Sequence, residues 1–202
     1  MGTEIERKFL TISDEWRKNA RGVSYVQGYL DEVRSVRVNL MGDYGVITVK
    51  GAKNFVYKIP AEEARGILGL PDKIVRARIA GDKGCLTIKG EAKGISRPEF
   101  EYEIPKADAA EMQKTICRDS LVEKTRYKVP FAGLTWEVDE FAGANKGLVV
   151  AEVELPSADH PVTLPPWVGA DVSQDKRYTN AELSKTPYTQ WKQDTKKCQL
   201  KP

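Results

Sequence analysis

The feature that most constrains this chain is an alternation of charged and apolar side chains that begins at its fourth residue. Successive side chains of a β-strand point to opposite faces, so Glu4, Glu6 and Lys8 would share one face of a strand. One such strand usually marks the exposed face of an open sheet. The same alternation recurs in the segments 75–79, 86–89, 99–104, 124–129, 136–139 and 151–155. A closed barrel would gather these faces into one charged interior.

Composition favours one compact domain and argues against several kinds of partner. The 202 residues carry 32 Lys and Arg against 29 Asp and Glu, and this net charge of +3 is too mild to indicate nucleic-acid binding. No stretch approaches the roughly 18 apolar residues of a membrane span, and no signal sequence opens the chain, so neither membrane insertion nor secretion is expected. The cysteines Cys85, Cys117 and Cys198 lack metal-ligand spacing and are expected to be reduced thiols of a cytoplasmic protein. His160 is the only histidine, which gives little support to zinc sites or His-based triads.

An internal repeat covers residues 33–70 and 72–115. The segment 36–51 recurs as 75–90, and each copy has two alternating runs joined by Gly-Asp-x-Gly, a turn that favours positive φ. Each copy continues with Phe-x-Tyr-x-Ile-Pro, from Phe55 and from Phe100, and then with a helical stretch. Two copies are too few for a solenoid, so the sequence predicts a duplicated hairpin-strand-helix segment within one fold. Because Arg78 of the second copy is Asn39 in the first, we expect the second copy to carry the charged chemistry.

The candidate inward residues fall into two groups of opposite charge. The bases are Lys8, Arg76, Arg78, Lys89, Arg97, Lys124 and Arg126, and the acids are Glu4, Glu6, Glu99, Glu101, Glu137, Asp139, Glu152 and Glu154. Burial of unpaired charges costs roughly several kcal/mol per ion, so these charges need compensation. Mutual salt bridges or an open polar sheet would supply it. We favour a water-filled tunnel that binds a polyanion and a divalent cation, because Arg and Lys suit phosphate oxygens and carboxylates suit Mg²⁺ or Mn²⁺.

Taken in order, these residues resemble the CYTH superfamily, the triphosphate tunnel metalloenzymes. The resemblance covers residues 4 to about 191 and rests on Glu4-x-Glu6-x-Lys8, Arg76-x-Arg78, Lys89, Ser96-Arg97-x-Glu99, Glu123-Lys124-Thr125-Arg126-Tyr127 and Glu152-x-Glu154. It implies an α+β fold in one domain over residues 1–202, built on a closed antiparallel eight-stranded β-barrel with flanking helices. It also implies that water attacks the terminal phosphorus of a triphosphate in the lumen, in a metal-dependent hydrolysis.

The same resemblance implies a role for each matching residue. Glu4, Glu6, Glu152 and Glu154 would bind Mg²⁺ or Mn²⁺, with Asp139 assisting at a second ion. The phosphates would be held by Lys8, Arg76, Arg78, Lys89, Arg97, Lys124 and Arg126, while Lys176 would close one mouth. Lys8 would also orient or activate the water, and activation would require a lowered pKa. The expected partner is a small-molecule triphosphate, with no nucleic acid and no membrane. A homodimer is a further expectation.

The repeat departs from the family pattern, which has one copy after Gly28-Tyr29-Leu30. Since a closed antiparallel barrel cannot accept three extra strands without breaking its alternation, the first copy must pack outside, be swapped with a neighbour or displace the second. Hydrolysis of inorganic tripolyphosphate is the leading function. One alternative is a class IV adenylate cyclase or a thiamine triphosphatase, which needs a pocket for the base or organic head group. The other is a non-catalytic polyphosphate-binding module crippled by the duplication.

Overall fold

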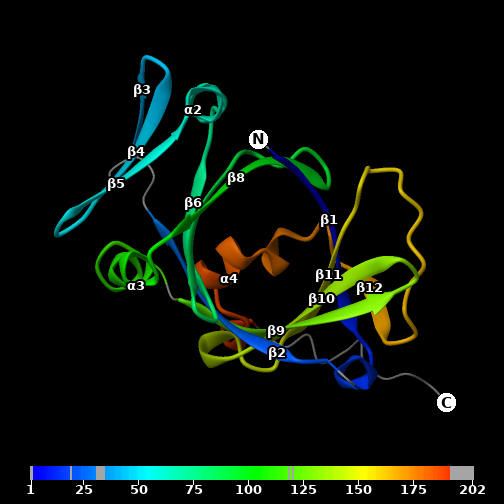
Figure 1. Cartoon of the computed structure of the whole chain (residues 1–202). Coiled ribbons are helices and arrows are strands. Elements are labelled where there is room, and N and C mark those ends of the chain that lie inside the picture. Colours follow the sequence, from blue (N-terminus) through cyan, green and yellow to red (C-terminus); the bar gives the residue numbers. More distant parts are fainter. Residues whose placement is uncertain (1, 19, 31–34, 118, 120, 192–202) are drawn as a thin grey trace.

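A closed antiparallel barrel forms the centre of the molecule (Figure 1), with its strands in the order β1-β11-β10-β9-β2-β6-β7-β8. The computed structural model describes residues 2–18, 20–30, 35–117, 119 and 121–191. The eight strands are β1 (Gly2–Thr11), β2 (Gly22–Leu30), β6 (Ile74–Ala80), β7 (Lys83–Lys89), β8 (Ser96–Ile104), β9 (Val122–Phe131), β10 (Leu134–Phe141) and β11 (Val149–Glu154). The predicted α+β fold with a closed eight-stranded barrel is confirmed.

Closure of the barrel depends on β1, which pairs on both of its edges. One edge pairs with β11, where Glu6 lies opposite Glu154 and Lys8 lies opposite Glu152. The other edge pairs first with β8 and then with the short strand β12 (Val168–Asp171). Because cross-strand neighbours share a face, this register turns the charged side chains of β1, β8 and β11 to the same side of the sheet. The apolar side chains of the barrel strands lie on the other side, where Phe9 of β1 and Trp136 of β10 belong to a buried cluster outside the lumen.

An apolar cluster closes one end of the barrel. It packs Leu183 of α4 (Asn180–Lys185) against Val122, Phe141 and Val150. These three strand residues lie two positions before or after Lys124, Asp139 and Glu152, so they share the inward face with those charged residues. Figure 1 shows α4 inside the ring of strands. The lumen is therefore blocked by side chains at this end.

The first copy of the repeat lies outside the barrel. The strands β3 (Val36–Met41), β4 (Tyr44–Lys50) and β5 (Asn54–Pro60) form a separate three-stranded sheet, followed by α2 (Ala61–Leu68). We call residues 36–68 the outer unit. The second copy supplies β6, β7 and β8 to the barrel, followed by α3 (Lys106–Thr115), and we call residues 74–115 the barrel unit. Figure 1 shows the strands β3, β4 and β5 of the outer unit at the side of the barrel, near α2 and α3. The first copy was expected to lie outside, to be swapped with a neighbour or to displace the second, and it lies outside. The origin of the two copies by duplication stays a prediction.

The remaining elements are short. Single 3₁₀ turns cover Glu15–Arg17, Gly143–Asn145, Lys176–Tyr178 and Tyr188–Gln190. Cys85 and Cys117 are free thiols, as predicted, while Cys198 lies outside the described residues. None of the helices in the described ranges is long and apolar enough to cross a membrane.

Candidate active site in the barrel lumen

The inward faces of the barrel strands line one cavity of about 780 Å³. Most of the predicted site residues lie in its wall: Lys8, Arg76, Arg78, Lys89, Arg97 and Arg126, together with Glu4, Glu6, Glu152 and Glu154. Glu99, Glu101 and Glu137, also predicted to face inward, line it too. The structure therefore brings together residues from seven strands, because the β-strand alternation gives each strand one charged face.

Lys8 lies between two carboxylates. Its Nζ is 2.6 Å from Glu152 Oε1 and 2.8 Å from Glu6 Oε1, and the residue is buried. Burial by itself would lower the pKa of Lys8, but Glu152 and Glu6 outweigh it and raise the pKa. Activation of water by Lys8 would need the opposite shift. In this arrangement Lys8 is a charged ammonium, suited to orienting a ligand oxygen.

Glu4 is held by two bases from neighbouring strands. Lys89 Nζ lies 2.8 Å from Glu4 Oε2, and Arg97 Nε donates to the same oxygen at 2.6 Å. Burial would raise the pKa of Glu4, but Lys89 and Arg97 overcome it and lower the pKa to about 2. Glu99 has the reverse balance, since burial and the nearby Glu4 raise its pKa more than Lys89 and Arg76 lower it.

The two arginines of β6 share one acid. Arg78 Nη2 donates to Glu101 Oε2 at 2.8 Å, and Arg76 Nη2 donates to the same oxygen at 3.4 Å and to Thr87 Oγ1 at 3.1 Å. The Nε atoms of Arg76 and Arg78 are buried, and neither has a hydrogen-bond partner among the described residues. These two N–H donors therefore have no acceptor among the described residues of the ligand-free barrel.

Arg126 is surrounded by acids near the blocked end. It donates to both carboxylate oxygens of Asp139 at 2.6 Å and to Glu152 Oε2 at 2.6 Å, and it also contacts Glu137. Lys124 is bonded to Asp139 and does not line the cavity. Burial and Arg126 lower the pKa of Lys124 more than Asp139 raises it, to about 8. Asp139 is fully buried outside the cavity wall, where it positions Arg126 and Lys124.

Glu154 differs from the other acids because it has no ion pair among the described residues. Burial raises its pKa, and Glu4, Glu137 and Glu6 raise it further, so negative charge exceeds positive charge around this carboxyl. Carboxylate oxygens are the ligands that hard divalent cations prefer. The donor set of Glu4, Glu6, Glu152 and Glu154 thus fits such a cation chemically. Within the described residues, however, no three acidic, cysteine or histidine side chains are already arranged to hold a metal, since Glu4, Glu6 and Glu152 are turned onto Lys and Arg.

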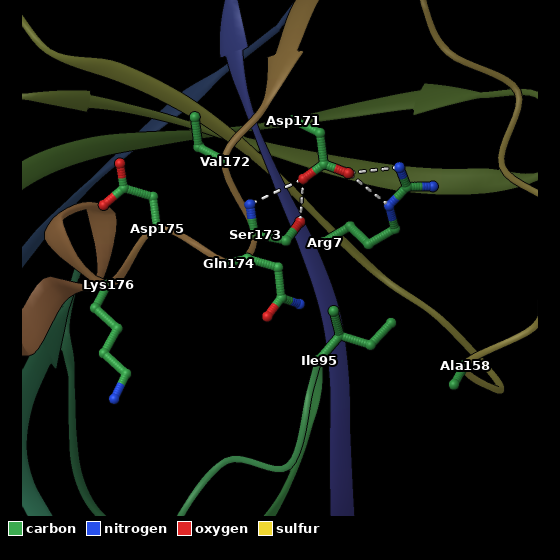
Figure 2. A pocket seen from close by; sticks show the side chains of 9 residues that line it. All are labelled: Arg7, Ile95, Ala158, Asp171, Val172, Ser173, Gln174, Asp175 and Lys176. Carbon is green, nitrogen blue, oxygen red and sulfur yellow. Dashed lines mark hydrogen bonds and ion pairs between the residues drawn. The ribbon is translucent and has the colours of Figure 1, made fainter.

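Lys176 lies elsewhere. It lines a second cavity of about 750 Å³ whose wall shares no residue with that of the lumen (Figure 2). Asp171 forms part of this wall, where it accepts hydrogen bonds from Arg7 Nη2 at 2.6 Å and from Ser173 Oγ at 2.5 Å. Figure 2 shows the Lys176 ammonium pointing away from these groups. The structure does not bring Lys176 together with the predicted phosphate-binding residues.

Several lumen residues carry no charge, and the charge pattern of the sequence therefore did not predict them. Tyr25 lies in the cavity wall, with the guanidinium carbons of Arg78 and Arg126 5.5 and 5.4 Å from its ring centroid. Asn180 of α4 also lines the cavity. Tyr29 lies opposite Arg76 across β2 and β6, its hydroxyl accepts from Gln27 Nε2 at 2.9 Å, and burial raises its pKa to about 12. Tyr25 and Tyr29 lie at alternating positions of β2, and this spacing could have predicted that both face the lumen. Nothing in the sequence predicted that α4 lies in the lumen.

A closed antiparallel barrel with cations and carboxylates interleaved on its inner wall defines a class of barrel proteins with a charged lumen. The chain belongs to the CYTH family, whose CYTH domain matches residues 68–189. This match begins at the last residue of α2, so it contains the barrel unit and excludes nearly all of the outer unit. The resemblance noted in the sequence is confirmed.

Similar proteins share a name. An inorganic triphosphatase of Acetivibrio thermocellus is 41% identical over 195 residues, which cover 96% of this chain and 100% of that protein. An inorganic triphosphatase of Nitrosomonas europaea is 41% identical over 95 residues, covering 45% of this chain and 62% of that protein. The crystal structure of the inorganic triphosphatase NE1496 superposes with a TM-score of 0.53 at 28% identity, over 91% of this chain and 95% of that one.

Proposed function

We propose that this chain is an inorganic triphosphatase that hydrolyses tripolyphosphate inside the barrel lumen. The observation that carries the proposal is the wall of the cavity, where Lys8, Arg76, Arg78, Lys89, Arg97 and Arg126 converge, each beside a carboxylate. Phosphate oxygens form the same charge-assisted hydrogen bonds as carboxylates, so a triphosphate can replace the acids as the partner of these bases. The inorganic triphosphatases among the similar proteins support the assignment.

Hydrolysis forms a bond between a water oxygen and the terminal phosphorus, and it breaks the bridging P–O bond so that pyrophosphate leaves. Negative charge spreads over the equatorial oxygens in the transition state, and catalysis consists mainly of positioning and electrostatic stabilisation. Arg76 and Arg78 suit this task because they extend from neighbouring inward positions of β6 and keep unpaired Nε–H donors. The charged ammonium of Lys8, held by Glu6 and Glu152, suits orientation of the water or of a phosphate oxygen.

The acids of the lumen would hold a divalent cation, Mg²⁺ or Mn²⁺. Glu154 and Glu6 lie opposite each other on β11 and β1, and Glu4 and Glu152 flank them on the same two strands. When bound, such a cation neutralises phosphate charge and lowers the pKa of a coordinated water. Ligand binding would release Glu4, Glu6 and Glu152 from their bases as phosphate oxygens take their place. Asp139 is better suited to positioning Arg126 than to binding a second ion, because Arg126 and Lys124 occupy its oxygens.

The nucleotide-specific alternatives lack a visible site for a base. Among the described residues that line the cavity, Tyr25 is the one aromatic side chain. Its ring already lies near the guanidinium groups of Arg78 and Arg126. An adenine or thiamine head group would need an open ring or a set of polar groups beside the phosphate site. This observation supports an inorganic substrate over a class IV adenylate cyclase or a thiamine triphosphatase.

Phosphate release from tripolyphosphate, with Mg²⁺, with Mn²⁺ and with EDTA, tests the proposal directly. We expect turnover with either metal, none with EDTA, and much slower release from ATP and thiamine triphosphate. Faster release from ATP would instead favour a nucleotide enzyme. Binding of tripolyphosphate without any turnover would favour the non-catalytic module. A cytoplasmic location and a homodimer stay predictions.

A further inference from the structure

The outer unit matches the barrel unit position by position in its apolar core. Aligned through the shared motifs, the buried residues pair as Ile47 with Leu86, Val49 with Ile88, Phe55 with Phe100, Ile59 with Ile104, Ala64 with Ala109 and Ile67 with Met112. All twelve side chains belong to one buried cluster. The two units therefore turn equivalent faces toward each other.

Reciprocal hydrogen bonds cross the contact between the units. Tyr57 Oη donates to Asp108 Oδ2 at 3.0 Å, and Tyr102 Oη donates to Glu63 Oε2 at 2.7 Å. Each tyrosine is the third residue of its Phe-x-Tyr-x-Ile-Pro motif, and each acid is the third residue after the proline of the other unit. Such exchange of equivalent partners is the mark of two-fold symmetry. The units thus pack back to back, and the face that looks into the lumen on the barrel unit looks away from the barrel on the outer unit.

This outward face repeats part of the lumen wall. Arg37 lies opposite Thr48 on β3 and β4, and Lys50 is two residues beyond Thr48 on the same face. These residues occupy the positions that Arg76, Thr87 and Lys89 occupy in the barrel unit. Lys58 adds a fourth polar side chain, from β5. We call Arg37, Thr48, Lys50 and Lys58 the outer basic face.

The cations of the outer basic face lack the acids found in the lumen. The strands β3, β4 and β5 contain no Asp or Glu. Arg37, Lys50 and Lys58 are exposed, and none of them forms an ion pair among the described residues. The equivalents Arg76 and Lys89 are each paired with Glu99. The positive charge of the outer basic face is therefore not compensated by acids of the same strands. In the barrel unit, the equivalent strands direct their cations into the lumen.

We propose that the outer basic face binds the phosphate chain of long inorganic polyphosphate; the choice of this ligand rests on the proposed function. The cations lie on three neighbouring strands, so the face is about 10 Å wide from β3 to β5, and a linear polyanion can contact all three where a small ion cannot. Lys58 Nζ lies 4.2 Å from the ring centroid of Tyr44, so this ring is partly covered. A polyphosphate chain needs no stacking surface, whereas single-stranded nucleic acid usually uses one.

The test compares two variants of the full chain that each remove three positive charges. R37A/K50A/K58A removes the outer basic face, and the control K93A/K114A/K146A removes exposed lysines elsewhere that also have no ion pair among the described residues. Fluorescently labelled long-chain polyphosphate is titrated in EDTA, with excess tripolyphosphate to fill the lumen. We expect about 10-fold weaker binding at low salt for R37A/K50A/K58A and a shallower salt dependence, with little change in the control.

Three other results would each overturn the inference. Equal binding by the two triple variants would show that net charge, not this face, attracts the ligand. Tighter binding of a single-stranded RNA of equal charge, lost in R37A/K50A/K58A, would assign the face to nucleic acid. Loss of tripolyphosphate turnover in R37A/K50A/K58A, with the fold intact by circular dichroism, would place the outer unit in the catalytic lumen. Failure of wild-type turnover concerns the proposed function alone, because the titration contains no divalent cation.

Discussion

Arg78 and Arg37 are arginines on equivalent β-hairpins, yet only Arg78 reaches the lumen. A donor aimed at charge that develops in a transition state is typically worth about 10²–10³ in rate. We therefore expect Arg78→Ala to lower kcat for tripolyphosphate by that factor and Arg37→Ala to lower it only a few-fold. Steady-state turnover of both variants, with matching melting curves, makes the comparison. Loss of turnover in Arg37→Ala would instead show that the outer unit lines the catalytic lumen.

Glu6 tests the metal site, since it lies opposite Glu154 and contacts both Lys8 and Arg97. Glu6→Gln keeps the size of the side chain and removes a charged oxygen ligand. We expect it to abolish metal-dependent turnover while the barrel stays folded. Glu103→Gln is a suitable control, because Glu103 pairs with Lys83 at an exposed position outside the cavity wall. Full activity of Glu6→Gln at saturating Mg²⁺ would rule out this ligand set.

Among the elements, α2 and α3 are linked to opposite units by the reciprocal tyrosines. A hydrogen bond to a carboxylate contributes roughly 1.5–3 kcal/mol to the free energy of unfolding. We expect Tyr57→Phe and Tyr102→Phe each to lower that free energy by about this amount, and by similar amounts, as the two-fold relation requires. Tyr44→Phe is the control, because no hydrogen bond of the Tyr44 hydroxyl occurs in the described structure. Urea unfolding of the three variants measures the differences, and a cost for only one interface tyrosine would contradict the symmetry.

The strands were predictable from the sequence because alternation depends on local geometry alone. Alternation placed Glu4, Glu6 and Lys8 on one face, and the barrel confirms it. Alternation alone could not decide which copy of the hairpin closes the barrel, since both copies have the same apolar face, but the difference between Arg78 and Asn39 favoured the second copy, which the barrel contains. That choice depends on long-range pairing of β6 with β2, where Tyr29 lies opposite Arg76. Nor could the sequence predict that Lys176 faces a separate cavity or that Leu183 blocks one end, because both follow from how the C-terminal segment packs.

Asp171, the last residue of β12, forms an ion pair with Arg7 of β1. Burial would raise the pKa of Asp171, but Ser173 and Arg7 outweigh it and lower the pKa below its usual value. Because the folded pKa is the lower one, this carboxylate stabilises the fold above about pH 4 and loses that effect as the pH falls through the folded pKa. We expect Asp171→Asn to be less stable than wild type at neutral pH, with the difference shrinking in acid. Thermal unfolding of both proteins from about pH 6 to about pH 3 measures this convergence, and a pH-independent difference would contradict it.

At the scale of the whole molecule, the barrel encloses many bases and many acids in one lumen. Within the described residues, each lumen base is already paired with a carboxylate, so the ligand-free barrel is electrically balanced. Entry of a triphosphate adds negative charge, and a divalent cation bound to the released acids restores the balance. Anion and cation should therefore bind together more tightly than either binds alone.

This linkage gives a prediction for thermal stability. A ligand present at about 100 times its Kd stabilises the folded state by roughly 2.7 kcal/mol, which for a chain of this size raises Tm by about 5–11 °C. We expect that shift with tripolyphosphate and Mg²⁺ or Mn²⁺ together and a smaller one with either component alone. Sodium sulfate at equal ionic strength controls for general salt effects, and Arg78→Ala should lose most of the shift. A Tm unchanged by millimolar tripolyphosphate and metal would exclude the lumen as the binding site, whereas equal shifts in wild type and Arg78→Ala would place the ligand outside it.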